Sequence, residues 1–370
     1  MLTPAETLRR VLAAASEVGP LPPERAPLAS GFGRALAEDL RAPCDLPAFD
    51  ASTMDGYALR ARDALRPGAR LPIAFEVFAG HPAPGPLPAG ACCRIMTGAS
   101  LPEGADCVEM QEEVRRAGRV ASFARAAEQG RFVRARASDL RAGAVALSAG
   151  TLVDAGAIGL AAGFGLHEVV VHQRPRVAIL PTGDELVASG APLAPGQAYE
   201  SNGHALAAAA REAGGDPVLL PVARDDEAAL ARALEAARGC DVLVTNGGVS
   251  VGARDFVKGA LAAAGARLDS WRVAMKPGKP FLIGRWGRAL VFGVPGNPAS
   301  ALVTFELFVR PALRALAGLR GHGRIEATAT LAAAQRKPEG LEVYLRVRLR
   351  PGRSGWIAEP LRTQISGHHS

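Results

Sequence analysis

From residue 176 onward, short apolar runs alternate with longer stretches rich in alanine and leucine. The apolar runs predict β-strands at 177–180, 218–222, 242–245 and 290–292, with a less clear strand near 271–275. The stretches between them predict helices over 202–213, 225–237, 255–264 and 298–316. Because strands and helices alternate, we expect a doubly wound, mostly parallel α/β core domain with helices on both faces of its sheet.

The remaining parts of the chain follow different patterns. Residues 1–19 predict an amphipathic helix capped by Thr3, and residues 69–150 are dense in proline and glycine, with β-like runs at 73–78 and 93–96. Strict alternation over 342–349 predicts a half-buried strand. We therefore expect a multidomain α/β protein with four parts. These are an N-terminal helical and extended domain (1–26 and 146–173), an inserted β-rich domain (27–145), the α/β core (174–320) and a small C-terminal β domain (321–370).

The composition of the chain limits the class of ligand that it can bind and the cellular compartment in which it works. The net charge of +7 is typical of proteins that bind nucleic acid, a membrane surface or a small anion. The basic residues are scattered and no basic run is interleaved with aromatics, so a small anion is favoured and nucleic acid is not. The five cysteines form no CxxC pair, which argues against structural zinc and suits a reducing compartment. The most apolar stretch, 155–166, is too short to span a membrane, and we expect a cytoplasmic protein.

Unusual loops follow the predicted strands of the core. Ligands of open α/β sheets bind beyond the carboxyl ends of the strands, so these loops are where a binding site is expected. Four such loops read PTGDE (181–185), NGGVSVG (246–252), KPGKP (276–280) and GVPGNP (293–298).

Two of these loops suit an anion, and a third indicates only the start of a helix. Backbone amides around Gly247 and Gly248 can cradle a phosphate, although a tight strand-to-helix turn explains the same glycines. Lys276 and Lys279 can direct two ammonium groups at one anion, although the pair taken in isolation is more typical of two solvated surface lysines. The segment at Gly296 and Asn297 opens a helix in an ordinary capping arrangement.

Acidic residues gather at the same predicted sheet edge. Carboxylates beside a phosphate site commonly hold Mg²⁺, and without a cation they would repel an anionic substrate. Helix capping is the alternative for two of them, because Asp225 and Asp255 each begin a predicted helix. The acidic residues are Asp184, Glu185, Asp225, Asp226 and Asp255.

Two polar segments lie far earlier in the chain, at 47–57 and at 95–106. Both predict turns, and periodicity assigns them no role. With the loops above, however, they form an ordered set of motifs that strongly resembles the MoeA/gephyrin E-domain family of molybdopterin molybdenumtransferases over nearly the whole chain. The motifs are PAFDASTMDGYA (47–58), IMTGA (95–99), TGDEL (182–186), YESNG (199–203), GGVSVGARDFVK (247–258), KPGKP (276–280) and PGNPAS (295–300).

The resemblance implies a homodimer with its active site in a cleft between subunits. It implies molybdate and adenylylated molybdopterin as substrates, AMP as a product and Mg²⁺ as cofactor. The implied catalytic residues are Asp55, Thr97, Glu185, Asp225, Asp255, Lys276 and Lys279, of which Glu185, Asp225 and Asp255 would hold the metal. The implied substrate-binding residues are Gly247, Gly248, Ser250, Gly296, Asn297, Ser300, Arg134 and Asp139.

The chain departs from the family pattern at two places. Residues 134–139 read RARASD where the family commonly has RRxGED, and the chain stops at Ser370 where the family's C-terminal domain continues, which implies a truncated domain. Protein partners implied by the family are a molybdopterin adenylyltransferase and molybdoenzyme acceptors. Two alternative functions stay open: the adenylyltransferase reaction itself, and a non-catalytic scaffold that binds peptides. The segments around Asp55 and Thr97 favour molybdenum insertion, and the acidic and lysine residues favour catalysis.

Overall fold

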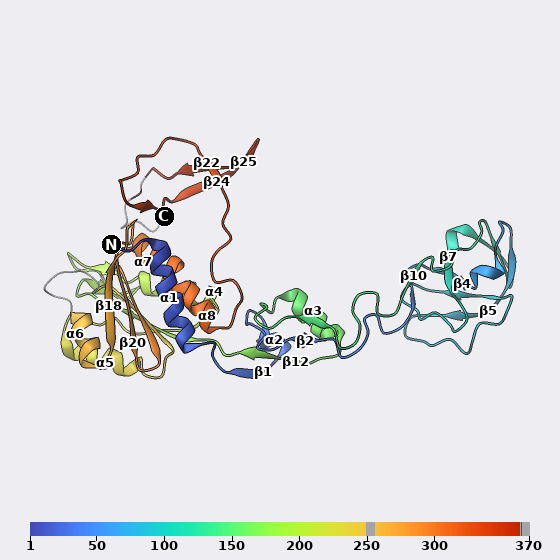
Figure 1. Ribbon diagram of the computed structural model, residues 1–370, viewed down its shortest axis with the longest axis horizontal. Helices are drawn as coiled ribbons and strands as arrows, with labels where there is room; N and C mark the ends of the chain where they lie inside the picture. The colour runs from blue at the N-terminus through green and yellow to red at the C-terminus, as the bar shows by residue number, and fades with distance from the viewer. Residues whose placement is uncertain (249–255, 363, 365–370) are drawn as a thin grey trace. The chain divides into compact units, whose positions relative to one another are not determined.

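The computed structural model describes residues 1–248, 256–362 and 364 (Figure 1). They form two compact units. Unit 1 comprises Met1–Glu38, Ala149–Gly159 and His167–Ser370, and unit 2 comprises Asp39–Ser148 and Leu160–Leu166. The finer division into four domains stays a prediction.

A six-stranded sheet organises unit 1. Its order is β16–β13–β17–β21–β20–β18. The first four strands are parallel, β20 runs antiparallel to β21, and β18, which is antiparallel to β20, runs in the direction of the first four. The mostly parallel α/β core is thereby confirmed. The strands are β13 (Arg176–Pro181), β16 (Asp216–Leu219), β17 (Val242–Asn246), β18 (Arg267–Arg272), β20 (Pro280–Trp286) and β21 (Ala289–Val294).

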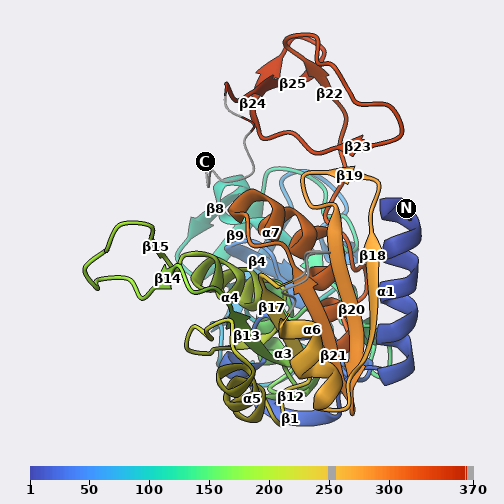
Figure 2. The same ribbon diagram turned by 90° about the vertical axis from the view of Figure 1, so that its left-hand side faces the viewer.

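Helices cover both faces of this sheet, because its central strands are apolar on both sides. In β13, Val177 and Ile179 join the core under α1 (Pro4–Val18), α4 (Asn202–Glu212), α7 (Pro298–Thr304) and α8 (Arg310–Leu316). The alternate residues, Ala178 and Leu180, join the core under α5 (Glu227–Ala236) and α6 (Phe256–Ala263). Figure 2 views this sheet with α1 beside the edge strand β18.

Thr3 caps α1 as predicted. Its hydroxyl accepts a hydrogen bond from the backbone N–H of Glu6, while the Glu6 carboxylate accepts one from the N–H of Thr3. The helix predicted over 225–237 begins two residues later, because the side chain of Asp226 rather than Asp225 accepts from the N–H of Ala229. The predicted start of the next helix, at Asp255, lies outside the described residues.

The helix predicted over 298–316 is not continuous α-helix. A π-helical turn, Phe305–Val309, separates α7 from α8. Pro311 explains the interruption, since it has no N–H to donate and its ring would clash with the carbonyl four residues earlier in a regular α-helix.

Strand boundaries also differ from the prediction. The strand predicted at 218–222 ends at Leu219, because Pro221 cannot donate to a ladder. The strand predicted near 271–275 lies earlier in the chain, at β18. Strand β18 ends before Val273, whose N–H bonds to the carbonyl of Lys279, and the short strand β19 (Met275–Lys276) follows. Strand β20 is not predicted at all.

Unit 2 is built on a second six-stranded sheet, with order β7–β4–β6–β5–β9–β8. This agrees with a β-rich segment between helical pieces. Its strands are β4 (Gly56–Leu59), β5 (Arg70–Val77), β6 (Cys92–Ile95), β7 (Cys107–Met110), β8 (Val114–Ala117) and β9 (Val120–Phe123). The cysteines of β6 and β7 are buried free thiols, and burial raises the pKa of the Cys92 thiol to about 12.

The strand predicted over 342–349 is divided in two. The N–H of Tyr344 bonds to the carbonyl of Lys276 at the end of the pairing between β23 (Glu342–Val343) and β19. The side chain of Tyr344 then packs against the main core of unit 1, and the chain resumes strand pairing only at β24 (Val347–Gly352). Strands β22 (Ala329–Leu331) and β25 (Gly355–Pro360) complete a three-stranded sheet with β24.

The remaining elements are short. Strand β1 (Pro23–Pro27) pairs with β12 (Glu168–His172) along its whole length. In the described part of the chain, no helix is both long and apolar enough to cross a bilayer. The other elements are α2 (Leu28–Gly31), β2 (Leu40–Arg41), β3 (Ala51–Ser52), β10 (Val133–Arg134), β11 (Val145–Leu147), α3 (Ala155–Gly163), β14 (Leu186–Val187), β15 (Ala198–Tyr199) and two 3₁₀ turns, Ala61–Asp63 and Gln111–Glu113.

Candidate active site

A cavity of about 330 Å³ lies at the carboxyl ends of β13, β17 and β21 in unit 1. Its position agrees with the rule that open α/β sheets bind ligands at this edge. Of the predicted site residues, Glu185, Gly296 and Asn297 line it. The other lining residues are Thr182, Leu186, Ala198, Tyr199, Glu200, Ser201, Asn202, Asn246 and Pro298.

A pair of asparagines joins three of the loops around this cavity. The Nδ2 of Asn202 donates to the Oδ1 of Asn246 at 3.0 Å and to the carbonyl of Gly296 at 2.6 Å. The Nδ2 of Asn246 donates to the carbonyl of Pro295 at 2.7 Å. Asn246 is only 2% exposed, so its amide depends on these partners. The two side chains fix the spacing of the loops.

Sequence reasoning did not select either asparagine as a site residue. One signal was available, because Asn246 is a polar residue at the end of a strand that is otherwise apolar and buried. Asn202 gave no such signal, since SNG at the start of a helix is an ordinary capping sequence.

The glycine loop after β17 makes a close backbone approach. Gly247 has φ +99°, and a Cβ built there would lie 2.7 Å from the Thr182 Oγ1 and 2.9 Å from its carbonyl oxygen. The N–H of Gly247 bonds to the carbonyl of Val294. The next glycine, Gly248, also has positive φ, at +62°, whereas Ser250 lies outside the described residues. Only glycine suits position 247.

Three carboxylates lie close together beside the cavity. The N–H of Asp225 donates to the Oδ1 of Asp184 at 3.2 Å. Burial, and then the charges of Asp184 and Glu185, raise the pKa of the Asp225 carboxyl. The carboxylate of Glu185 folds back over Gly183, where a built Cβ would lie 2.7 Å from its Oε2. The negative charges of these three carboxylates are therefore not fully neutralised by the side chains around them.

These carboxylates are oxygen donors of the kind that Mg²⁺ takes. Among the described residues, no group of three or more acidic, histidine or cysteine side chains is arranged to hold a metal ion. Asp255, the third predicted ligand, lies outside those residues. Glu185 and Asp225 have the oxygen atoms that such an ion takes, and the pKa of Asp225 is raised by burial and then by the charges of Asp184 and Glu185, which a bound cation would offset.

The lysine loop packs on α7. A Cβ built at Gly278, whose φ is +96°, would lie 2.6 Å from the Thr304 Cγ2 of that helix. Lys276 and Lys279 are exposed on either side, and neither ammonium group has a hydrogen bond or ion pair within the described part of the chain. Both ammonium groups are therefore open to an anion, although neither residue lines the 330 Å³ cavity. Ser300, in α7, is 5% exposed and its carbonyl accepts the hydroxyl of Thr304.

Unit 2 brings two predicted catalytic residues together. The Oδ1 of Asp55 accepts the backbone N–H of Thr97 at 2.8 Å and its hydroxyl at 2.7 Å. These two hydrogen bonds lower the pKa of the Asp55 carboxyl. Asp55 immediately precedes β4, where a Cβ at Gly56 would lie 2.0 Å from the carbonyl oxygen of Glu109, so this turn requires glycine.

The predicted Arg134 and Asp139 form an ion pair in unit 2. The hydrogen bond from Arg134, and a second from Ser138, lower the pKa of the Asp139 carboxyl. Arg136 bonds instead to Asp45, at 2.6 Å. The altered RARASD segment therefore keeps an arginine–carboxylate pair.

Comparison with known proteins covers both units. Residues 2–165 match the family described as the MoeA N-terminal region (domain I and II), and residues 178–315 match the probable molybdopterin binding domain. A molybdopterin molybdenumtransferase of Nostoc is 40% identical over 295 residues, which are 78% of this chain and 68% of that protein. Molybdopterin molybdenumtransferase 2 of Mycobacterium tuberculosis is 39% identical over 334 residues, 88% of this chain and 82% of that protein.

The chain belongs to the molybdopterin molybdenumtransferase family. The fold agrees with solved structures of molybdopterin biosynthesis MoeA protein from Pyrococcus horikoshii. One matches with a TM-score of 0.83 at 27% identity, over 100% of this chain and 92% of that one. Another matches with a TM-score of 0.78 at 33% identity, over 98% of this chain and 90% of that one. Membership in the molybdopterin molybdenumtransferase family confirms the resemblance, while the roles of individual residues stay predictions.

Proposed function

We propose that this transferase inserts molybdenum from molybdate into adenylylated molybdopterin and releases AMP. Family membership supports transfer of molybdenum to molybdopterin. The observation that carries the finer proposal is the 330 Å³ cavity, where Asn202 and Asn246 join three motif loops beside an acidic group. A site that pairs anion-binding loops with carboxylates suits a substrate with a phosphoanhydride.

Lys276 and Lys279 would hold the oxyanions. Their ammonium groups are exposed, and Gly278 between them keeps the loop against α7. An ammonium group stabilises the negative charge of molybdate or phosphate oxygens without requiring a fixed geometry. Gly247, Gly248, Gly296 and Asn297 would contact the rest of the substrate through the adjoining loops.

Glu185 and Asp225, together with Asp255, would hold Mg²⁺. When bound, the metal supplies positive charge at the phosphoanhydride. The acidic residues would position the cation. The cation would in turn offset the burial, and then the charges of Asp184 and Glu185, that raise the pKa of Asp225.

Asp55 would act as an ionised acceptor. An aspartate carboxylate is ionised near neutral pH, and the two hydrogen bonds from Thr97 lower the pKa of Asp55 further, so its carboxylate would accept a hydrogen bond from the substrate rather than donate one. Thr97 would fix the direction of that carboxylate.

The proposal includes a homodimer whose active site combines residues of both subunits. It is supported by the division of the implied catalytic residues, since Asp55 and Thr97 belong to unit 2 and the lysines and acidic residues belong to unit 1. Isologous dimers commonly complete a site in this way. We place the reaction in the cytoplasm, where the five free cysteines would stay reduced and molybdoenzyme acceptors are available.

Purified protein mixed with adenylylated molybdopterin, Mg²⁺ and molybdate tests the proposal, with AMP and molybdenum cofactor followed together. Molybdate-dependent AMP release that Asp55→Ala abolishes is the expected result. Release of pyrophosphate from ATP would instead identify an adenylyltransferase. Tight binding of the pterin nucleotide without any release would identify a scaffold.

A further inference from the structure

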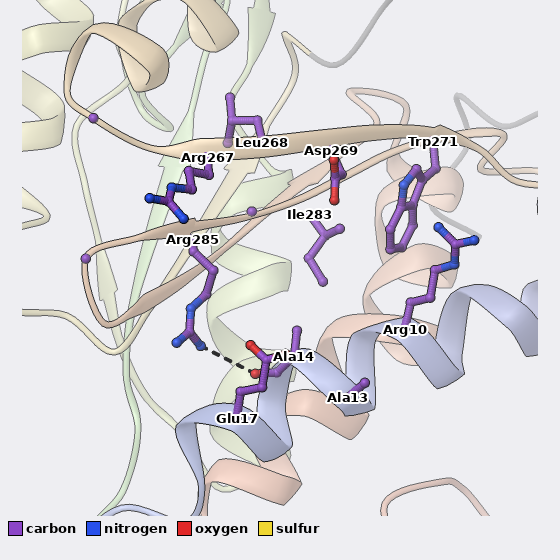
Figure 3. A pocket seen from close by; sticks show the side chains of 13 residues that line it. Arg10, Ala13, Ala14, Glu17, Arg267, Leu268, Asp269, Trp271, Ile283 and Arg285 are labelled. Atoms are coloured by element: carbon purple, nitrogen blue, oxygen red, sulfur yellow. Dashed lines mark hydrogen bonds between the residues drawn. The ribbon is translucent and has the colours of Figure 1, made fainter.

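A second hollow lies between α1 and the β18–β20 hairpin, and none of the residues that line it also lines the 330 Å³ cavity. This groove has a volume of about 890 Å³, within the range of small-molecule sites. Figure 3 shows the side chains that line it. Those that matter here are Arg10 from α1, Arg267, Asp269 and Trp271 from β18, and Ile283 and Arg285 from β20.

The three residues from β18 present different chemistry in a fixed order. Alternate residues of a strand point to the same face, so Arg267, Asp269 and Trp271 all face α1, as Figure 3 shows. Consecutive members are separated by roughly 7 Å along the strand, and the outer two by about 13 Å. A cation, an acceptor and an aromatic ring therefore follow one another along the groove.

At one end of the groove, two arginines face each other across strands. Arg267 and Arg285 are direct register partners in the antiparallel pair. Like charges at such positions repel. Within the described part of the chain, neither guanidinium forms an ion pair, including with Glu17 of α1 at the same end, and Arg285 makes only a 3.4 Å hydrogen bond to the carbonyl of Ala14. An anionic group with several oxygens would satisfy both arginines at once.

The other end of the groove is lined by an aromatic ring. The guanidinium of Arg10 lies over the ring of Trp271, 5.4 Å from its centroid. Ile283, only 5% exposed, forms the floor between the two ends. Asp269 stands midway, opposite Ile283 in the register.

We propose that this groove binds a mononucleotide. The phosphate lies between Arg267 and Arg285, the ribose hydroxyls donate to the Asp269 carboxylate, and the base stacks at Trp271 and Arg10. The order of these groups along the strand is that of a phosphate, a sugar and a base in one nucleotide, and a carboxylate is a common partner of ribose hydroxyls. The site is separate from the proposed active site and does not depend on its chemistry.

Calorimetric titration with AMP tests the site. The titrations use the full chain carrying Lys276→Ala and Lys279→Ala, which weakens anion binding at the proposed active site. On that background, Arg267→Gln and Arg285→Gln should each raise the Kd for AMP roughly tenfold or more, because each removes a charge-assisted contact. Arg288→Gln removes the same charge from an exposed turn next to the groove and should leave the Kd unchanged.

Two further ligands separate a nucleotide site from a simple anion site. Ribose 5-phosphate lacks the base and adenosine lacks the phosphate, so both should bind more weakly than AMP. Equal binding of AMP, ribose 5-phosphate and inorganic phosphate would overturn the proposal, since the ring would then contribute nothing. It would also be overturned by AMP binding that neither arginine substitution affects, or by no AMP binding at millimolar concentration.

Discussion

The carboxylate of Asp55 receives both the N–H and the hydroxyl of Thr97 on the same oxygen, at 2.8 and 2.7 Å. Two residues 42 positions apart in the sequence are thereby held as one hydrogen-bonded group. This arrangement lowers the pKa of Asp55 and fixes the direction of its free oxygen.

Replacing Thr97 by valine should therefore move the acid limb of the pH–activity profile to higher pH. The substitution removes the hydroxyl donor and keeps the backbone donor, so the pKa of Asp55 rises toward its ordinary value and the carboxylate protonates sooner as the pH falls. Thr97→Ser keeps a hydroxyl and should retain the wild-type profile. If Thr97→Val leaves the acid limb in place, Asp55 ionisation does not limit the reaction.

Asn202→Ala should destabilise the protein. The change leaves the buried Oδ1 of Asn246 without its donor, which costs on the order of 1–3 kcal/mol. Urea denaturation of the variant gives the free energy of unfolding. Arg211→Ala, an exposed substitution in the same helix, is the control and should change stability little. Equal stability of Asn202→Ala and the control would mean that the asparagine pair does not fix the loops.

Gly247→Ala should reduce both stability and turnover. A methyl group there meets Thr182 at under 3 Å and the backbone has φ +99°, so the loop must shift, at a cost of about 1–3 kcal/mol. Gly259→Ala is the matched control, because that glycine lies inside α6 with open space around it, and the change should stabilise by roughly 0.5–1 kcal/mol. If Gly247→Ala melts at the wild-type temperature and keeps wild-type activity, the close approach of Gly247 to Thr182 is contradicted.

Mg²⁺ should stabilise the wild-type protein more than Asp225→Asn. A raised pKa means that the fold disfavours the ionised carboxyl, so this group lowers stability as the pH rises from its ordinary pKa through the raised value. In EDTA at neutral pH, Asp225→Asn should melt at a higher temperature than wild type. With Mg²⁺ the order should reverse while the variant loses activity. Identical melting shifts with Mg²⁺ in both proteins would exclude Asp225 as a ligand.

Mixing two inactive variants tests the shared active site. Asp55→Ala and Lys276→Ala, unfolded and refolded together, should form hybrid dimers in which one of the two sites is intact, and random pairing should restore about a quarter of wild-type activity. Each variant refolded alone should stay inactive. No recovery, with dimers present by gel filtration, would show that each site lies within a single subunit.

Local sequence patterns predicted most of the α/β core, because β13, β17 and β21 are apolar runs between helical stretches. They missed β20, which begins at Pro280 and contains Gly284. Gly284 is required there by packing, since a Cβ would lie 2.5 Å from the carbonyl oxygen of Arg267 on the neighbouring strand. No local pattern reveals such a contact.

The sequence predicted the loops that form the candidate site, but not the hydrogen bonds between the side chains within it. The glycine, lysine and acidic segments carry recognisable chemistry, and the carboxyl-edge rule assigned them to one side of the sheet. The hydrogen bond between Asn202 and Asn246 joins residues 44 positions apart, and the one between Asp55 and Thr97 joins residues 42 apart. These pairings depend on tertiary structure, so motif reasoning could name some of the residues but not their partners.

The pairing of β1 with β12 has a kinetic consequence. Pro23 lies opposite His172, and next to this ribbon the N–H of Gly150 bonds to the carbonyl of Leu36, so nearly all of unit 2 is one long loop closed at its base. The entropy of closing a loop grows only logarithmically with its length, but contacts between such distant residues form slowly. Once unit 2 has folded, the flexible chain that separates Leu36 from Gly150 is shorter, so these two residues meet more readily. During synthesis, unit 2 emerges before β12, so the ribbon should close last, after the loop it encloses has folded.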